Sequence, residues 1–307
     1  MNYILVLIAT ILLAFDFSIS KKYQIIMGTS FPSGLFYNAL NGLCTAFIFW
    51  GLCGFRAEFS LYSVIMAFLM SLFAMLYSLI GFQILKAGNM ALYSLFLMSG
   101  GMLLPYLFGT LFLNEYLSIF RIVGVVLILA AIVLSNRGSF SLSGLQILFC
   151  VLIFVLNGLV SIISKCHQIN TVYETVDSTA FVMYSGIGRF LLSTLALFFC
   201  KPEENSDTPQ TSQSSPSEKP WRSTMRTALS FRIPLVLIVC SALIGGVSYM
   251  LQLIGAKELP ATVLYPMVTG GSIIFSAVCG RLFFKEKITT FQLLSILLCF
   301  VGTCLFL

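Results

Sequence analysis

Apolar residues along the chain form ten long runs that are separated by mostly short polar connections. Each run is close to the roughly 20 residues that a helix needs to cross the hydrocarbon core of a bilayer. The backbone finds no water to bond with in lipid, so such runs must be helical. The sequence therefore predicts ten transmembrane helices, at about residues 3–20, 33–52, 60–85, 89–113, 118–135, 143–164, 178–200, 231–254, 260–284 and 289–307.

Two stretches of the chain resemble each other when the sequence is shifted by 171 positions, which places Lys86 on Lys257. No gap is needed over about 50 residues, and polar and small residues match as well as apolar ones. The other matches are Gly100 with Gly271, Gly109 with Gly280, Leu111 and Phe112 with Leu282 and Phe283, Glu115 with Glu286, and Phe120 with Phe291. The sequence therefore predicts an internal duplication.

The fourth and ninth runs are interrupted at matching places. The fourth contains Ser99, Gly100, Gly101 and Pro105, and the ninth contains Pro260, Pro266, Gly270 and Gly271. Proline removes a helical hydrogen-bond donor, and glycine lets neighbouring helices approach closely. Interruptions at corresponding positions of two halves point to the substrate cavity of a transporter. For the glycines alone, tight helix packing is an equal explanation.

After each interrupted run comes the pattern Gly-x-Leu-Phe-x-x-Glu-x-[Ile/Leu]-[Ser/Thr], at residues 109–118 and 280–289. An interrupted apolar helix, this pattern and a further apolar helix resemble the drug/metabolite transporter superfamily, and within it the EamA-like family. The resemblance implies an all-α integral membrane protein whose ten transmembrane helices form two inverted five-helix repeats. The expected repeats are residues 1–138 and 139–307.

Composition supports a membrane protein and leaves little room for other classes. The chain is 59% apolar and only 9% charged, whereas a soluble domain carries about 25% charged residues. The net charge of +6 arises in short connections, so we do not expect a nucleic-acid partner. The nine cysteines show no zinc-like spacing, and we expect no metal or cofactor. Residues 201–228 are rich in Pro, Ser, Thr and Gln and are expected to be a disordered loop.

A five-helix unit ends on the side of the membrane opposite to its start, so the second repeat is predicted to be inverted relative to the first. The positive charges of the connections test this prediction. The side that holds the 1–2, 3–4, 5–6, 7–8 and 9–10 connections carries twelve Lys and Arg residues, and the other side carries four. The positive-inside rule then places both termini outside the cell. Relatives of the family more often have cytoplasmic termini, so the two arguments conflict and the orientation stays open.

Two charged residues lie deep inside predicted helices, away from their ends, Asp16 in the first and Arg189 in the seventh. Charges at bilayer depth are costly and usually face a cavity or a partner. Asp16 can bind a coupling proton, or it lies near the membrane surface beside Lys21 and Lys22. Arg189 can clamp an anionic group of a substrate through its planar fork of donors, or pair with Asp16 for structural reasons.

Amides and tyrosines inside the apolar runs complete the candidate substrate-binding residues. An apolar cavity with a few polar groups suits a small amphipathic solute. The alternatives are interhelical hydrogen bonds for the amides and packing or an interfacial position for the tyrosines. Asn157 is the most interesting amide, because its helix is the predicted repeat partner of the helix that carries Asp16. The candidates are Asn38, Asn41, Gln83, Asn157, Gln252, Tyr77, Tyr93, Tyr249 and Tyr265.

Several other polar residues are expected to be architectural. Glu115 and Glu286 lie in tight turns before Ser118 and Thr289, which can cap the next helix. Lys86 and Lys257 end their helices and are expected to reach the membrane surface. The only histidine, His167, falls in a predicted connection, where a lone histidine is seldom a metal ligand.

The sequence thus predicts a secondary active transporter that moves a small organic metabolite or drug-like solute by alternating access, with the substrate cavity between the two repeats. The alternative is a non-transporting membrane scaffold or partner subunit. A membrane enzyme acting on lipid is disfavoured, because no catalytic constellation is visible. We expect a multi-pass monomer in a cell membrane, such as the bacterial inner membrane, with a solute, lipid and a coupling proton as partners.

Overall fold

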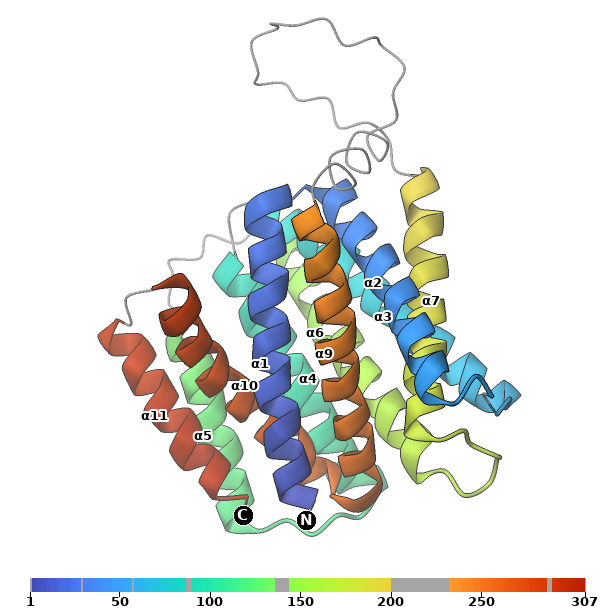
Figure 1. Cartoon of the computed structure of the whole chain (residues 1–307). Helices are drawn as coiled ribbons and strands as arrows, with labels where there is room; N and C mark the ends of the chain where they lie inside the picture. The colour runs from blue at the N-terminus through green and yellow to red at the C-terminus, as the bar shows by residue number, and fades with distance from the viewer. Residues whose placement is uncertain are drawn as a thin grey trace, which may run out of the picture.

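The computed structural model describes residues 2–28, 30–56, 58–86, 90–135, 144–199, 232–285 and 289–306. Within these residues all regular structure is α-helical, as predicted, and ten helices are present (Figure 1). They are α1 Asn2–Met27, α2 Phe31–Leu52, α3 Leu61–Lys86, α4 Met90–Phe112, α5 Ile119–Ser135, α6 Gly144–Ile169, α7 Ser178–Phe199, α9 Arg232–Glu258, α10 Ala261–Phe284 and α11 Thr290–Cys304. The predicted loop 201–228 and the predicted boundary between the repeats lie outside the described residues.

Eight of the ten helices are long and apolar enough to cross a membrane. The exceptions are α5 and α11, the last helices of the two predicted repeats. At a rise of about 1.5 Å per residue, their 17 and 15 residues extend about 26 Å and 22 Å, less than a hydrocarbon core of about 30 Å. The prediction of ten apolar helices is confirmed, and that of ten spans is supported by length for eight of them.

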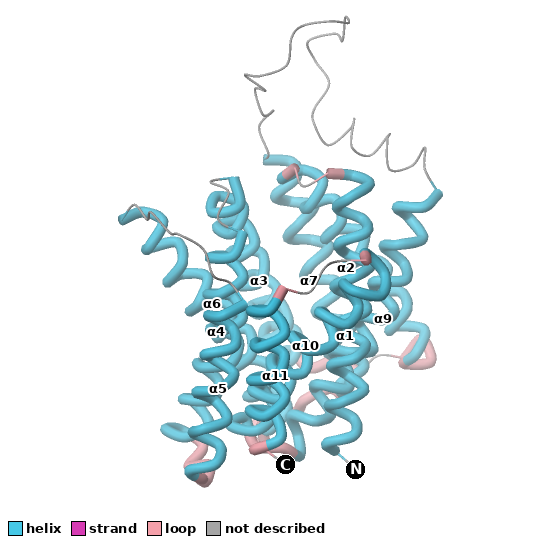
Figure 2. Tube along the Cα trace, turned by 90° about the vertical axis from the view of Figure 1, so that its left-hand side faces the viewer, coloured by secondary structure: helices cyan, strands magenta, loops and turns pink. Residues whose placement is uncertain are grey.

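The helices lie side by side in a bundle, with their connections at its two ends (Figure 2). Both chain termini lie at the same end (Figure 1). Helix α1 packs against α9 and α10, while α6 packs against α3 and α4. The remaining major contacts join α2 to α7 and α9, α3 to α7, α4 to α10, and α5 to α11. Helices from the two ends of the sequence are therefore interleaved throughout the bundle.

Glycines allow the closest of these contacts. A Cβ atom on Gly42 of α2 would lie 2.7 Å from the backbone nitrogen of Phe190 and 2.8 Å from the carbonyl oxygen of Gly186, both in α7. A Cβ atom on Gly302 of α11 would lie 3.0 Å from the carbonyl oxygen of Gly124 in α5. Small residues at such crossings let two backbones touch, as is common between membrane helices.

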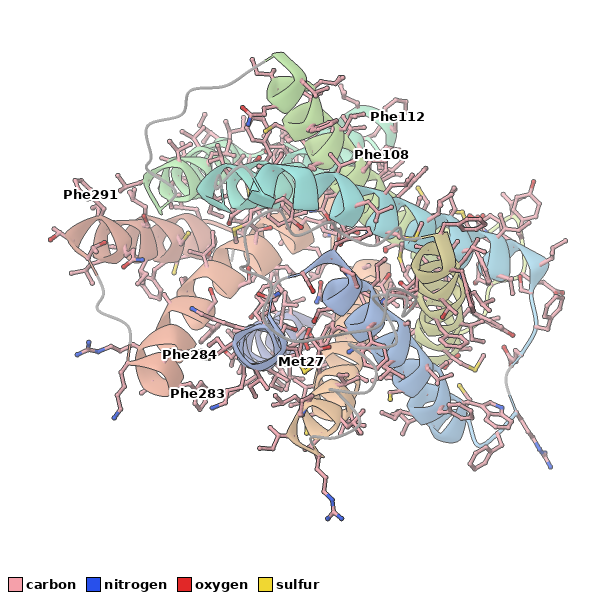
Figure 3. The ribbon with its side chains drawn as sticks, turned by 90° about the horizontal axis from the view of Figure 1, so that it is seen from above. Met27, Phe108, Phe112, Phe283, Phe284 and Phe291 are labelled. Carbon is pink, nitrogen blue, oxygen red and sulfur yellow. The ribbon has the colours of Figure 1, made fainter. Side chains whose placement is uncertain are left out.

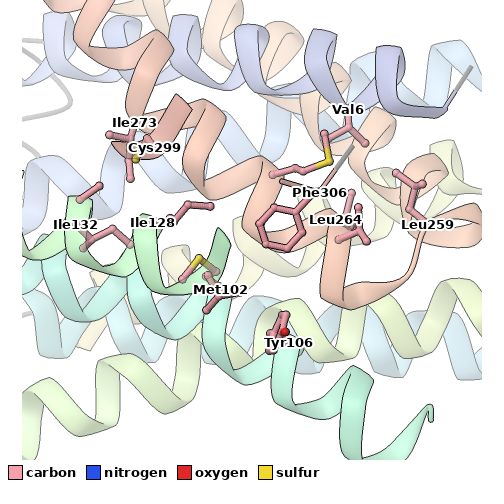
Figure 4. Close-up of a cluster of buried hydrophobic side chains, with 14 of the residues drawn as sticks. Val6, Met102, Tyr106, Ile128, Ile132, Leu259, Leu264, Ile273, Cys299 and Phe306 are labelled. Atoms are coloured by element: carbon pink, nitrogen blue, oxygen red, sulfur yellow. The ribbon is translucent and has the colours of Figure 1, made fainter. Parts of the chain in front are cut away.

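Buried apolar side chains form two main clusters. One cluster joins α1, α4, α5, α9, α10 and α11 around Met102, Ile128, Leu264 and Cys299 (Figure 4). The other joins α2, α3, α6, α7 and α9 around Phe49, Ala67 and Phe181. The outer surface is also apolar, and Phe112 is 71% exposed there (Figure 3). Such a surface suits lipid as the surrounding solvent.

The junction between α9 and α10 is held by two charged side chains from elsewhere in the chain. Glu115 accepts hydrogen bonds from the backbone nitrogens of Ala261 (2.7 Å) and Thr262 (2.8 Å) at the start of α10. The Lys165 ammonium donates to the carbonyl oxygens of Ala256 (2.7 Å) and Leu259 (2.6 Å) at the end of α9. Each charge complements the dipole of the helix end that it contacts.

Two residues expected in the connection after the sixth helix lie inside the bundle instead, because α6 continues to Ile169. Lys165 is only 4% exposed, so it is not a loop cation that reports membrane orientation. His167 is fully buried, with Nε2 2.8 Å from Ser63 Oγ and its ring 3.9 Å from that of Phe181. Tertiary contacts with α3, α7 and α9 extend the helix beyond the apolar run.

Candidate functional site

Four polar side chains from four helices form a continuous hydrogen-bonded group in the bundle, which we call the central polar group. It consists of Asp16 (α1), Asn41 (α2), Arg189 (α7) and Ser241 (α9). Arg189 Nη1 donates to Asn41 Oδ1 at 2.8 Å, and Asn41 Nδ2 donates to Ser241 Oγ at 3.2 Å. Ser241 in turn donates to Asp16 Oδ1. Three of the eleven predicted site residues are therefore brought together.

Asp16 of the central polar group lies near the middle of α1, a helix long and apolar enough to cross a membrane. Asp16 is 14 residues from Asn2 and 11 from Met27, or about 21 Å and 16 Å along the helix axis. Ser241 and Asn41 are buried, and Asp16 and Arg189 are half-buried. Lys21 and Lys22 lie five and six residues closer to the Met27 end of the same helix.

The hydrogen bonds connect a negative and a positive charge through neutral groups. Asn41 Oδ1 faces the guanidinium, which leaves its amide nitrogen to face Ser241. Arg189 is close enough to Asp16 for the two charges to interact electrostatically. Such interactions are strong in a site of low dielectric constant. The group can therefore hold both charges in the bundle and offer an acidic and a basic surface to a solute.

Glycine makes room for the carboxylate. Asp16 lies against α9, where a Cβ atom on Gly245 would be 2.8 Å from Asp16 Oδ2. Gly245 is one helical turn beyond Ser241, so both residues lie on the face of α9 that meets α1. Any larger residue at position 245 would displace the carboxylate from its place beside Ser241.

Tyr37 and Ser20 extend the hydrogen bonds of the central polar group, and neither was predicted. The Tyr37 hydroxyl lies 2.5 Å from Ser241 Oγ and 2.7 Å from Ser20 Oγ. A periodicity of four could have found them, because Ser20 follows Asp16 by four residues and Tyr37 precedes Asn41 by four. Such pairs share a helix face. No comparable signal pointed to Ser241.

Three of the four predicted tyrosines line the same region of the bundle. Tyr77 and Tyr249 are within electrostatic range of Arg189, and Tyr265 is near Tyr249. The Tyr249 hydroxyl lies 2.7 Å from Ser164 Oγ, and that of Tyr265 donates to the carbonyl oxygen of Ser161 at 2.5 Å. Tyr249 and Tyr265 are therefore held by hydrogen bonds to α6.

The other tyrosine, Tyr93, packs with Tyr77 in an apolar cluster around Ile84 and Ile153. Its ring occupies the space that Gly81 leaves open on α3. In the structure its surroundings are those of a packing residue, which was the alternative for each tyrosine.

The remaining amides do not join the central polar group in the described part of the chain. Asn157 donates to the carbonyl oxygen of Leu97 at 2.7 Å, over Gly101 of the interrupted helix α4. Gln252 donates to Ser248 Oγ at 3.3 Å within α9. Asn38 is half-buried on α2. Gln83 belongs to α3, but its side chain lies outside the described residues. Asn157 therefore makes the interhelical contact that was its alternative.

The described residues form no candidate metal site, and an apolar groove lies apart from the central polar group. Among the described residues, no three His, Cys, Asp or Glu side chains are grouped as a metal site would require. A groove between α2 and α7 has an apolar lining that includes none of the predicted site residues. It is formed by Phe36, Ala39, Leu40, Phe190, Thr194, Leu197 and Phe198.

Comparison with known proteins places the fold and the family. Twenty-six chains of solved structures match this chain. One of them, described only as the crystal structure of a protein, is 15% identical, covers 99% of this chain and 96% of its own, and superposes with a TM-score of 0.73. At that identity the likeness shows the fold alone. No curated protein matches.

The model of the EamA-like transporter family matches residues 144–307, which is more than half of the chain and begins at the first residue of α6. This family belongs to the drug/metabolite transporter superfamily, and the members of the family are transporters rather than enzymes. The chain is therefore a helical, multi-pass membrane protein that belongs to the EamA-like transporter family.

Proposed function

We propose that the protein is a secondary active transporter that moves a small organic metabolite or drug-like solute by alternating access. The observation that carries this proposal is the central polar group. Asp16 and Asn41 come from the first half of the chain, and Arg189 and Ser241 come from the second. A charged residue inside a membrane-spanning helix is a functional-site hypothesis by default. A site shared by both halves changes shape when one half moves against the other.

The helix contacts support an inverted repeat. The main contacts between helices map onto one another when the first five helices are exchanged, in order, with the last five. This exchange replaces α1, α2, α3, α4 and α5 by α6, α7, α9, α10 and α11, and the reverse. The contacts of α1 with α9 and α10 become those of α6 with α3 and α4. The pairs α2–α7, α4–α10 and α5–α11 map onto themselves. A two-fold relation between residues 1–138 and 139–307 accounts for this pattern.

The interrupted helices support the same relation. Gly100 of α4 lies against the backbone of Phe154 in α6. Its predicted equivalent, Gly271 of α10, lies against Thr10 in α1, 3.2 Å from where its Cβ atom would be. Both α4 and α10 contain a proline, and they pack against each other. These helices can flex beside the site during a change of access.

The chemistry of the side chains favours a small amphipathic solute. Arg189 offers bidentate donors, Asp16 offers acceptors, and Tyr77, Tyr249 and Tyr265 offer apolar faces with hydroxyl groups. Although they lie in the bundle, Asp16, Arg189 and these tyrosines are each half-buried. Partial exposure of polar side chains within a bundle supports a substrate cavity between the two halves.

The driving force is a gradient. The sequence holds no G-x-x-x-x-G-K-[Ser/Thr] nucleotide-binding motif, so the free energy for transport comes from the gradient of the solute or from the gradient of a coupling ion. Asp16 is the residue to carry a coupling proton. We further propose a monomer in a cell membrane such as the bacterial inner membrane, because two fused repeats provide one complete pathway.

A non-transporting membrane scaffold or partner subunit is the alternative. It explains the apolar surface and the ten helices, but it gives no reason to place an aspartate and an arginine near each other within the membrane. The cost of such placement is about 2.5–3.5 kcal/mol per charge on insertion scales.

Solute counterflow in proteoliposomes tests the proposal. The reconstituted protein should exchange at least one member of a panel of amino acids, nucleosides and cationic drugs. Asp16→Asn and Arg189→Gln should abolish that exchange, because each removes a charge of the central polar group. Lys22→Gln, which removes an exposed charge from the same helix as Asp16, is the control. No exchange of any solute, with and without a proton gradient, would favour the scaffold.

A further inference from the structure

Hydroxyl groups connect Asp16 to the end of α1 that carries Lys21 and Lys22. Ser241 Oγ contacts Asp16, the Tyr37 hydroxyl contacts Ser241, and Ser20 Oγ contacts Tyr37. The chain of contacts comes from three helices, α1, α2 and α9. Ser20 is half-buried and is 7 residues, or about 10 Å along the axis, from Met27. The contacts therefore run from Asp16 toward the Met27 end of α1.

The direction of each hydrogen bond follows from proton counting. Ser241 has one hydroxyl proton, and it donates that proton to Asp16. Tyr37 must then donate to Ser241, because Ser241 has no second proton to give. By the same argument Ser20 donates to Tyr37. Every hydroxyl between Ser20 and Asp16 therefore donates toward the carboxylate.

The neighbouring amide stabilises this direction. Asn41 Nδ2 is a second donor to Ser241 Oγ, and Asn41 is held in that orientation by Arg189. With two donors on its oxygen, Ser241 can donate only to Asp16. The charged and titratable groups that act on Asp16 are Tyr37 from α2 and Arg189 from α7, while α9 contributes the neutral Ser241.

We propose that Ser20, Tyr37 and Ser241 form a proton relay between Asp16 and the membrane surface at the Met27 end of α1. A hydronium ion gives one proton to Ser20 Oγ and leaves as water, and the protons of Ser20, Tyr37 and Ser241 each move one oxygen along. Asp16 gains one proton, and every hydroxyl ends with one proton, as it began. The hydroxyls then rotate to restore the starting direction.

The relay deepens the proposed function, on which its purpose rests, by naming the proton as the coupling ion and giving its route. The relay also predicts that the two faces of the membrane differ, since the proton reaches the shared site from only one of them. The Tyr37 ring is held against Tyr23, with 4.7 Å between ring centroids, so its hydroxyl has a fixed position in the relay.

Time-resolved infrared spectroscopy after a pH jump tests the relay in the full-length protein reconstituted in lipid. The carbonyl band of a protonated carboxyl group that disappears in Asp16→Asn reports the protonation of Asp16. Tyr37→Phe keeps the ring and removes one oxygen of the relay. We expect protonation of Asp16 to become slower, on the order of a hundredfold, in Tyr37→Phe and in Ser20→Ala.

Tyr23→Phe is the matched control, because it keeps the ring that packs against Tyr37 and removes a buried hydroxyl that is not part of the relay. It should leave the protonation rate unchanged. An unchanged rate in both Tyr37→Phe and Ser20→Ala would overturn the relay, as would the absence of any band that depends on Asp16. The outcome is independent of solute transport: a working relay without counterflow would refute the proposed transporter, and counterflow without a relay would refute only this inference.

Discussion

Asn41 is the residue that joins the two charged side chains of the central polar group. It accepts from Arg189 and donates to Ser241, which contacts Asp16. A hydrogen bond to a charged group is worth more than one between neutral groups, and a buried donor left without a partner is costly. Asn41 is therefore expected to matter more for stability than other amides in the bundle.

We predict that Asn41→Leu destabilises the protein by about 1–3 kcal/mol, because it leaves Arg189 and Ser241 without their shared partner. Thermal unfolding in detergent measures the effect. Asn38→Leu is the control, since Asn38 lies on the same helix and no hydrogen bond of its side chain is seen in the described residues. Equal stability of Asn41→Leu and the wild-type protein would contradict the described contacts.

Glu115 has a structural role that the sequence indicated only in part. It was expected to be architectural within its own turn, and it instead caps the start of α10 from the connection between α4 and α5. The spacing in sequence is 146 residues, so no local pattern can reveal the contact. Capping side chains contribute because the first helical N–H groups have no partner within the helix.

Glu115→Ala is predicted to lower stability by about 0.5–2 kcal/mol, as expected for the loss of a helix cap. Glu58→Ala makes the same change of charge at an exposed residue between α2 and α3 and should have little effect. Denaturant titration of both variants provides the comparison. If the two variants were equally stable, the carboxylate would not be capping α10.

At the scale of the helices, the contact between α2 and α7 determines where Asn41 and Arg189 meet. Gly42 and Gly186 bring the two backbones together directly beside these residues. The two nearest atoms that a Cβ on Gly42 would meet belong to the backbone of α7, which cannot move aside as a flexible side chain can, and the third is the Cβ atom of Arg189. The site thus depends on the absence of a side chain at position 42.

Gly42→Ala is predicted to destabilise the protein by about 1–3 kcal/mol, because the helices must separate to accept the new methyl group. Gly51→Ala on the same helix is the control. Its Cβ atom would meet only Phe55, at 3.9 Å. Removing a flexible glycine should leave the control at least as stable as the wild-type protein. A Gly42→Ala variant that matched Gly51→Ala would show that the two helices do not touch.

At the scale of the whole molecule, hydropathy predicted the helices well because lipid requires long apolar runs. Hydropathy failed at the end of α6, where Lys165 and His167 remain helical. The Lys165 ammonium is hydrogen-bonded to carbonyl oxygens at the end of α9, and the His167 ring is hydrogen-bonded to the hydroxyl of Ser63. The charged and amide residues of the site stood out against apolar neighbours. Ser241, Tyr37 and Ser20 did not, because serine and tyrosine are ordinary in membrane helices.

The central claim is that the two halves enclose a site that opens to one face of the membrane at a time. The reactivity of a cysteine introduced at position 249 measures this access, in a protein whose native cysteines are replaced. Tyr249 is half-buried near Arg189, whereas Phe181 is fully buried in an apolar cluster and serves as the control position.

Tyr249→Cys should react with a thiol reagent that cannot cross the membrane when the reagent is added to one face. A solute that supports counterflow should change that rate or the reactive face, while Phe181→Cys stays unreactive. If the cysteine at position 249 reacted from neither face under any condition, the space between the halves would be closed and the protein would not be the proposed transporter.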